Sequence, residues 1–346
     1  MKKFLFRGRM APPAGSVLLG VLVSWFCGAC SMGEAAQMLG KHSQTPAYLG
    51  CKAASPREFQ FSFSQPVEVL SFTTDPPLPV QEISRGALVQ VILSGDVPGG
   101  EPYTADILVK DDEGNTLNVL VPFRSRNERI PQILINELRT EYSKPRTEFV
   151  ELKTLEAGNL GALRLFIAGH TANPLIFEFP PVEVAAGEYI LLHLRSIESN
   201  EAVMVNETGT ALDLSGGTDS RADARDLWVP ASEKLLHKTD AVYLMDQDDR
   251  IIDAVMLSEN DDPWWTKEHF VQAADLLYRQ GAWVQAEGRI PGPSDAVITA
   301  GIKTAMTRSI SRDKTLPDTN TNADWYISAT SAVSPGTENN PKRYEE

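Results

Sequence analysis

Apolar and polar residues alternate along most of the chain from Pro56 onward. In "EFQFSFSQPVEVLSF", apolar side chains occupy every second position from Phe59 to Phe63 and recur at Val67 and Val69. Successive side chains of a β-strand point to opposite faces, so a period of two predicts a strand with one buried face.

The alternation continues through "ALVQVILSG" and "YTADILVKDDEGNTLNVLVPF". The internal "DDEGN" predicts a β-hairpin, because Gly and Asn tolerate the positive φ angles of tight turns. Several short strands within about 75 residues predict a small immunoglobulin-like β-sandwich over residues 56–129. The absence of a cysteine pair excludes the antibody type.

A second β-rich region follows Pro131, where "ILINEL" and "EFVELK" predict two strands around a Pro-containing loop. The strand ending in "NEL" at Leu138, the "EFVEL" of residues 148–152 and the following "LGALRLF" resemble the opening of the lamin-tail domain. That domain is an immunoglobulin-like β-sandwich found in nuclear lamins and in many bacterial exported proteins.

The resemblance extends over residues 131–340. "GEYILLHLR" is similar to the middle strand of the family, and "TDAVYLMDQDDRIIDAVML" to its hairpin, whose second strand carries an Asp, here Asp253. "RSISRDKTLPDTNTNADWYISATSAVSPGTEN" is similar to its end, with an Arg-bearing strand, an Asx-rich turn, Asp-Trp and Ser-Pro-Gly. The resemblance implies an all-β chain with a second, lamin-tail-like sandwich over residues 130–340 and a tail at 341–346.

One departure concerns the third strand of this region. The aromatic residue that the family often has there is replaced by the aliphatic run Leu163, Leu165 and Ile167. We therefore expect different local packing within the same fold.

A single helix is predicted within "DDPWWTKEHFVQAADLLYRQGAW", over residues 263–280. Asp262 is placed to cap it, Pro263 suits the first helical position, and Gly281 stands where a helix ends. Apolar residues recur at helical spacing at Phe270, Ala273, Ala274 and Leu277.

The other interruption is the connection "NETGTALDLSGGTDSRADARDLWVP". Long loops in compact domains are often functional, so Arg221, Arg225 and Trp228 form a candidate contact surface. The alternative is a solvated loop with Trp228 folded into the interior.

The segment "DTNTNADW" places oxygen-bearing side chains at Asp318, Asn320, Asn322 and Asp324. Calcium loops use positions one, three and five in this way, but the helix-loop-helix type also needs Gly at six and Glu at twelve. Ala323 and Ala329 stand at these two positions instead. An Asx-rich turn before the strand "WYISAT" is the simpler interpretation, with Trp325 in the core and its indole N–H in need of a partner.

Motifs of enzymes are missing from the sequence. There is no G-x-S-x-G, no P-loop and no G-x-G-x-x-G, and no two histidines have the spacing of metal ligands. The five histidines are His42, His170, His193, His237 and His269. His193 lies among leucines and is expected to be a structural residue, and "DQDDR" is expected to be a charged hairpin tip. We predict no catalytic residues, no cofactor and no metal site.

The net charge of −14 limits the partners. Residues 1–29 carry four basic and no acidic side chains, so the remainder carries −18. An acidic surface repels phosphate backbones, which disfavours nucleic-acid binding.

The N-terminus predicts export and lipidation. "MKKFLFRGR" is basic, and the apolar run "GSVLLGVLVSWFCGA" is too short for a comfortable membrane span, so residues 1–29 are interpreted as a signal peptide. "CGAC" resembles a bacterial lipobox with Cys27 in place of the usual Leu, which makes Cys30 the predicted lipidation site. Residues 30–55 would form a flexible tether, and Cys51 would be the remaining thiol of the mature chain.

These predictions favour a non-catalytic envelope lipoprotein that binds another envelope or extracellular protein through its loops. Its lipid anchor would place it on the outer side of the cytoplasmic membrane or on the outer membrane. An accessory subunit of an exported hydrolase or nuclease complex is the alternative, and a nucleic-acid binder is opposed by charge.

Overall fold

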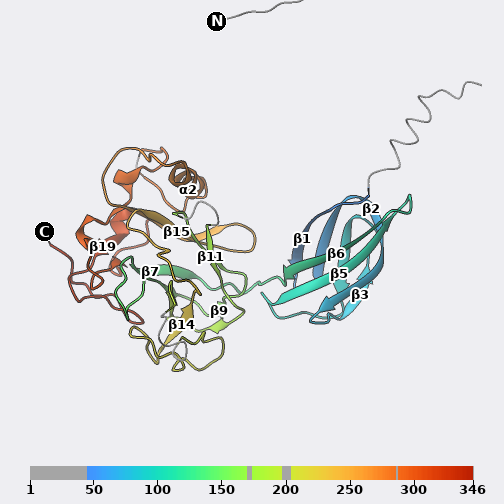
Figure 1. The fold of residues 1–346 in the computed structure, drawn as a ribbon, viewed down its shortest axis with the longest axis horizontal. Coiled ribbons are helices and arrows are strands. Elements are labelled where there is room, and N and C mark those ends of the chain that lie inside the picture. Colours follow the sequence, from blue (N-terminus) through green and yellow to red (C-terminus); the bar gives the residue numbers. More distant parts are fainter. Residues whose placement is uncertain (1–44, 170–173, 197–203, 286, 346) are drawn as a thin grey trace, which may run out of the picture. The chain divides into compact units, whose positions relative to one another are not determined.

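The structure, a computed structural model, describes residues 45–169, 174–196, 204–285 and 287–345 (Figure 1). The predicted signal peptide, Cys30, His42 and His170 lie outside these residues. The described chain is all-β apart from one α-helix and three short 3-10 turns, which confirms the predicted fold class. Among the described residues, no helix has both the length and the apolar character needed to cross a membrane.

The first module is a six-stranded antiparallel sheet. Its strands are β1 (Tyr48–Ser55), β2 (Glu58–Asp75), β3 (Val80–Ile83), β4 (Gly86–Leu93), β5 (Pro102–Asp111) and β6 (Thr116–Arg124). The order is β3-β4-β2-β5-β6, and β1 also pairs with β2. Residues 58–63 of β2 pair with β1, residues 58–62 and Val67 pair with β4, and residues 67–75 pair with β5. The long strand β2 thereby joins two parts of one sheet around a common core.

The alternation seen in the sequence produces this core. Phe59, Phe61 and Phe63 are at most 3% exposed, and they pack with apolar residues of β4, β5 and β6. The predicted turn between β5 and β6 is present, with Gly114 at φ 90° and the Asp111 carboxylate accepting backbone N–H groups.

The predicted tether is too long at its C-terminal end. Residues 48–55 form β1, whose residues pair in register with β2. Cys51 lies on this strand half-buried, and burial raises the pKa of its thiol to about 12. The β period was missed there because the small and polar residues of "YLGCKAAS" alternate only weakly.

The second module contains two large sheets. The first, which we call the β7 sheet, has the order β14-β13-β8-β7-β18-β19. Its strands are β7 (Ile133–Arg139), β8 (Phe149–Thr154), β13 (Tyr189–His193), β14 (Ala224–Trp228), β18 (Ile310–Arg312) and β19 (Trp325–Ile327). The pair β13–β14 is parallel, and the other pairs are antiparallel.

The second large sheet, the β15 sheet, has the order β11-β10-β15-β16-β17. Its strands are β10 (Arg164–Ile167), β11 (Leu175–Glu178), β15 (Asp240–Met245), β16 (Ile251–Ser258) and β17 (Val297–Ile298). A separate pair consists of β9 (Gly158–Asn159) and β12 (Glu183–Val184).

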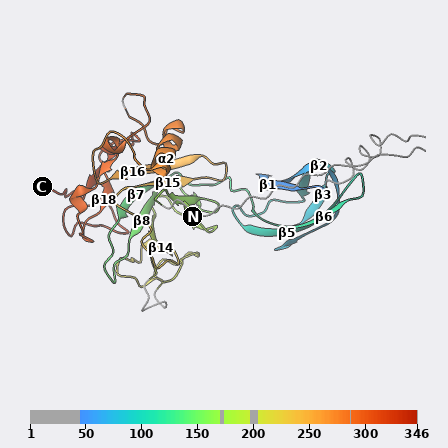
Figure 2. The same ribbon diagram turned by 45° about the horizontal axis from the view of Figure 1, so that its top comes forward.

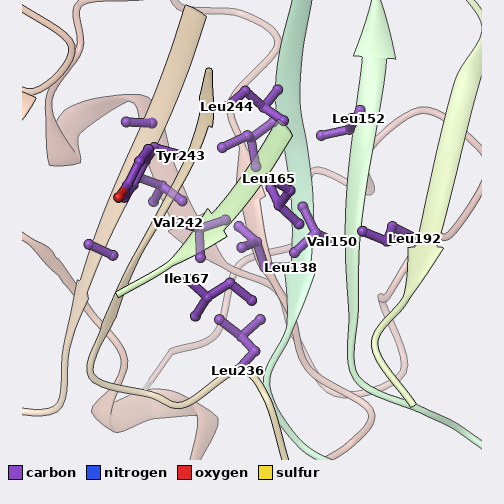
Figure 3. Packing of buried hydrophobic residues seen from close by; sticks show 14 of the residues in the cluster. Leu138, Val150, Leu152, Leu165, Ile167, Leu192, Leu236, Val242, Tyr243 and Leu244 are labelled. Carbon is purple, nitrogen blue, oxygen red and sulfur yellow. The ribbon is translucent and has the colours of Figure 1, made fainter. Parts of the chain in front are cut away.

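The two large sheets face each other across one apolar core. Figure 3 shows Val150, Leu152 and Leu192 of the β7 sheet directed toward Leu165 and Ile167 of the β15 sheet. All five side chains are fully buried. The aliphatic side chains Leu165 and Ile167 of β10 are therefore packed inside the sandwich.

The only α-helix of the described chain, α2 (Glu268–Arg279), packs on β15 and β16 (Figure 2). Phe270, Ala273, Ala274 and Leu277 are its buried residues. Because α2 covers the face of β15 that points away from the core, all six residues of that strand are buried.

The predicted start of this helix was wrong by five residues. Lys267, rather than Asp262, holds the N-cap position, although Gly281 ends the helix at φ 70° as predicted. The carbonyl of Asp262 accepts the N–H of Ser294. Residues 262–267 are therefore held as a loop against the 3-10 turn η2 (Pro293–Asp295).

The predicted tail also belongs to the folded module. Ser328 and Arg343 form a β-bridge, and the N–H of Tyr344 donates to the carbonyl of Ile327. The Arg343 guanidinium pairs with Asp313. Residues 341–344 therefore extend the module beyond its predicted end.

Candidate ligand-binding site

The three residues of the predicted contact surface lie in different environments. Arg221 is exposed and donates to the carbonyl of Pro335 at 2.9 Å. Arg225 and Trp228 lie on β14 and are 2% and 5% exposed. Both side chains are directed into the module and are not available to a partner. For Trp228 this agrees with the alternative interpretation, in which its side chain is folded into the interior.

Arg225 is used to hold the loop in place. Its guanidinium pairs with Glu188 at 2.8 Å and donates to the carbonyls of Glu207 and Gly209. The indole of Trp228 donates to Ser215 at 3.0 Å and stacks on His193, with 3.7 Å between ring centroids.

The same loop covers the free side of the edge strand β14. The carboxylate of Glu207 accepts the N–H of Asp226, and the carbonyl of Asp226 accepts the N–H of Glu207. The side chain of Asn206 accepts the N–H of Trp228 at 2.7 Å. Buried backbone groups need such partners, and here a loop provides them in place of another strand.

A hydroxyl, an imidazole and a carboxylate lie in series beneath this loop. Thr147 Oγ1 is 3.3 Å from His193 Nδ1, and His193 Nε2 is 2.6 Å from Asp226 Oδ1. Such a series activates nucleophiles in enzymes. Each of the three residues is only 1% exposed, so no substrate can reach them. The expected structural role of His193 is confirmed by its burial and its partners.

Two buried carboxylates hold the C-terminal "SPGTEN" segment. Glu137 accepts the N–H of Ser334 at 3.1 Å, and Glu151 accepts the N–H of Gly336. Both glutamates are 0% exposed. Asn339 joins this cluster by donating to the carbonyls of Asn136 and Arg312.

Burial raises the pKa values of both carboxyl groups. For Glu137 the increase is opposed by hydrogen bonds from Ser309, Ser334 and Ser311. The pKa of Glu151 is well above its ordinary value, because burial and the nearby charge of Glu137 both disfavour its ionisation.

Asp253 connects the two large sheets. Its carboxylate lies 2.7 Å from Arg312 Nη2 and accepts the N–H of Ile135. Arg312 also donates to the carbonyl of Ile135 at 2.8 Å. Burial raises the pKa of Asp253 to about 6, although the Arg312 guanidinium opposes the increase.

The "DTNTNADW" segment is an Asx-rich turn. Asp324 accepts hydrogen bonds from Thr319 and Thr321, and Asp318 pairs with Arg312 at 2.9 Å.

Trp325 is 6% exposed, and the Arg312 guanidinium lies 4.5 Å from its ring centroid. Its indole N–H has no hydrogen-bond partner within the described part of the chain. In that part, no three His, Cys, Asp or Glu side chains group as metal ligands.

The charged "DQDDR" segment is the tip of the hairpin between β15 and β16, as predicted. Asp246 accepts the N–H groups of Asp248 and Arg250. The carboxylates of Asp248 and Asp249 pair with Arg126 and Arg164. The three carboxylates therefore stabilise the hairpin tip and attach it to Arg126 and Arg164.

A cavity of about 370 Å³ lies between the end of β16 and the start of α2. We call it the Trp264 pocket, because Trp264 is part of its lining and is 69% exposed. The lining also includes Trp265, Glu259, Asn260, Asp262 and Lys267. A volume of this size is within the range of small-molecule sites.

The wall of the Trp264 pocket is fixed by hydrogen bonds. The indole of Trp265 donates to the carbonyl of Pro291 at 2.9 Å. Glu259 pairs with Lys238 at 2.6 Å, and its N–H donates to Thr239. The side chain of Asn260 accepts the N–H of Asp262 at 3.3 Å.

Two residues of the lining, Gly169 and His237, are held by Asp240, which is fully buried. Its carboxylate accepts the N–H groups of Gly169, His237 and Ala241. A side chain at Gly169 would collide with this carboxylate, since an added Cβ would lie 2.7 Å from Oδ2.

The pocket was not predicted from the sequence because the Trp pair was assigned to the helix. On a helix, two consecutive side chains point about 100° apart, so one of two adjacent tryptophans cannot share the buried face. The pair "WW" was therefore the available indication that one indole is exposed.

These features define a two-sheet, all-β module with one covering helix and a polar-aromatic pocket. The chain belongs to the family TP_1001_2nd, described as "protein second domain", whose profile matches residues 131–327. That range contains both large sheets, α2 and the Trp264 pocket.

A protein of Treponema pallidum (strain Nichols), named "Uncharacterized protein", is 27% identical over 180 residues, which are 50% of this chain and 45% of that protein. The chain therefore matches less than half the length of this relative. Among solved structures, the N-terminal part of the bacterial S-layer protein SbsC aligns with 65% of this chain and 46% of its own, at 13% identity and a TM-score of 0.25.

Proposed function

We propose that this protein is a non-catalytic lipoprotein of the cell envelope that acts as a binding module. The observation that carries the binding role is the Trp264 pocket, where a large indole is exposed on a wall fixed by hydrogen bonds. Rigid exposed aromatic side chains contribute strongly to recognition, because little conformational entropy is lost when they bind.

The distribution of polar residues supports a non-catalytic role. Thr147, His193 and Asp226 have the chemistry of a catalytic series, but they are buried beneath the loop that covers β14. Glu137 and Glu151 are occupied by backbone N–H groups of the C-terminal segment. The two glutamates stabilise the C-terminal segment, and this structural role explains why carboxyl groups are buried there.

We further propose that the second module is related to lamin-tail domains. The Asp of its hairpin, Asp253, pairs with Arg312 of the Arg-bearing strand. The Ser-Pro-Gly segment is bound by Glu137 of the "NEL" strand. The motifs that resemble the lamin-tail family are far apart in the sequence but contact one another in the structure. Such contacts are expected if these motifs stabilise the fold of that family.

The envelope location rests on the N-terminal sequence. A basic start, an apolar run too short to span a membrane, and small residues before Cys30 support lipidation at that cysteine. Acyl chains contribute about 0.8 kcal/mol per buried methylene, so two or three chains are sufficient to anchor a protein. The anchor would lie on the outer side of the cytoplasmic membrane or on the outer membrane.

Metabolic labelling with a radioactive fatty acid tests the anchor. We expect the wild-type protein to incorporate label in a bacterial host and Cys30→Ala to incorporate none, because the thiol is the acceptor. Cys27→Ala is the matched control and should be labelled, since Cys27 would leave with the signal peptide. Equal labelling of wild type and Cys30→Ala, or of neither, contradicts the proposal.

A further inference from the structure

We propose that the Trp264 pocket binds a neutral saccharide, an inference that rests on the binding function proposed above and names its ligand class. The argument depends on three properties of the pocket. These are an exposed aromatic face, planar polar side chains around it, and balanced charge.

The aromatic face is provided by Trp264. Tryptophan is among the more buried residue types on average, yet this side chain is 69% exposed on a cavity wall. Its neighbours hold the loop, because the Trp265 indole donates to Pro291 and the Asp262 carbonyl accepts from Ser294. Trp264 is thus presented to solvent by a loop that is anchored on both sides.

A pyranose ring has a face of C–H groups and a rim of hydroxyl groups. An indole stacks on the C–H face, where it buries apolar area, while the hydroxyl groups remain at the edge of the aromatic ring. The combination of one aromatic surface with a few polar groups is the composition expected of a specific small-molecule site.

Residues with planar polar side chains share the lining with Trp264. The lining includes the carboxylates of Glu259 and Asp262 and the amide of Asn260. Carboxylate and amide groups accept or donate two hydrogen bonds in one plane, which suits pairs of adjacent hydroxyl groups. Ser258 orients Asn260, since its hydroxyl lies 3.4 Å from Asn260 Oδ1 and accepts the N–H of Asn260.

The charge of the pocket favours a neutral ligand. Glu259 pairs with Lys238 at 2.6 Å, and Asp262 and Lys267 contribute one charge of each sign to the lining. The carboxylate of Asp240, next to the lining residues Gly169 and His237, already accepts three backbone N–H groups. Ion recognition requires an excess of the opposite charge, and these groups provide none. A strongly acidic or basic ligand would therefore gain little here.

Titration calorimetry on the full-length protein tests the inference, in a detergent without a sugar headgroup. Cellobiose, lactose and N,N′-diacetylchitobiose are the probes, each up to about 10 mM, the range that detects weak single-site binding. We expect at least one of them to bind. We expect Trp264→Ala to weaken that binding about tenfold or more and Trp264→Phe to retain part of it, because a smaller ring still stacks.

Leu214→Ala is the matched control, because Leu214 is also an exposed apolar residue of the second module. It should bind like the wild type. Binding that is unchanged in Trp264→Ala, binding of acidic oligosaccharides alone, or no binding of any probe overturns the inference. If Cys30 is labelled while no saccharide binds, the anchored lipoprotein stands and the ligand class is wrong.

Discussion

At the scale of single residues, the main finding is the use of buried carboxylates to fix loops. The outer face of a sandwich sheet is normally solvated and polar. Here the C-terminal segment covers part of that face, and Glu137 and Glu151 accept its backbone N–H groups. Residues that would suit a solvated sheet surface therefore act as buried partners of irregular backbone.

The raised pKa of Glu151 leads to a prediction about pH. Its pKa is higher in the folded protein than the ordinary value of 4.5, so the folded state binds more protons than the unfolded state above that pH. Stability contributed by this group is fully present at low pH and is lost as pH rises through the folded pKa. We expect Glu151→Gln, which resembles the protonated acid, to lose fewer degrees of Tm than the wild type between pH 5 and pH 8.

Scanning calorimetry across this pH range measures the difference. Glu156→Gln is the control, because Glu156 is an exposed carboxylate in the same part of the chain. It should reproduce the wild-type pH dependence. If Glu151→Gln and wild type change in parallel, the carboxyl of Glu151 is not a titrating group in this range.

Individual residues were predictable from sequence where a local rule applied. The Asx-rich turn was predicted because Asp and Asn accept nearby backbone donors, and Asp324 does so. The burial of Arg225 depends on Glu188 and on carbonyls of a distant loop, which no local pattern reveals. For that reason an arginine in a Gly- and Asp-rich segment was interpreted as a surface residue.

At the scale of elements, the pair Asp253–Arg312 links the two sheets of the sandwich. Asp253 lies on β16 and Arg312 on β18, and both contact the backbone of Ile135 on β7. The family resemblance identified Asp253 and an Arg-bearing strand. It did not identify their contact, because sequence alone gives no distance between residues 59 positions apart.

We expect Asp253→Asn to lower the free energy of unfolding by about 3 kcal/mol, because it leaves the Arg312 guanidinium without its buried partner. Urea unfolding measures the change. Asp275→Asn is the control, since Asp275 forms a surface pair with Arg279 that contributes about 0.5 kcal/mol or less. Adding Arg312→Met to Asp253→Asn should restore part of the loss. Equal costs for Asp253→Asn and Asp275→Asn would contradict a role of this pair in joining the sheets.

The position of α2 shows both the strength and the limit of local patterns. The apolar spacing gave its buried face, and Gly281 gave its end. The Asp-Pro pair at its predicted start instead contacts η2, so a tertiary interaction replaced a helix-initiating signature. The Trp264 pocket was missed as a result of that one displaced boundary.

At the scale of the whole molecule, the all-β class followed directly from the period of two, and Pro131 was interpreted as the boundary between two modules. The ends of the modules were less accurate. Residues 48–55 and 341–344 belong to folded structure because they pair with distant strands or backbone groups. Composition near a terminus does not reveal such pairing.

The contacts of the C-terminal segment predict the effect of truncation. Removal of residues 333–346 would eliminate the N–H groups bound by Glu137 and Glu151 and the side chain of Asn339. Each of the two buried carboxyl groups would lose a backbone partner and keep only side-chain partners, which together costs several kcal/mol. We expect the second module to unfold while the first, which has a core of its own, remains folded.

Limited proteolysis with mass spectrometry should then yield a resistant fragment that ends near Arg124. Removal of only the last two residues is the control and should leave both modules resistant to protease. A truncated chain that is as resistant as the full chain would show that these contacts are dispensable.

The covered edge of β14 limits aggregation between neighbouring copies of the chain. Strand edges with unpaired N–H and C=O groups are templates for aggregation. On β14, Asn206 and Glu207 already bond the outward groups of Asp226 and Trp228. Neighbouring copies of the chain at high local concentration therefore find no template on that edge for adding a strand.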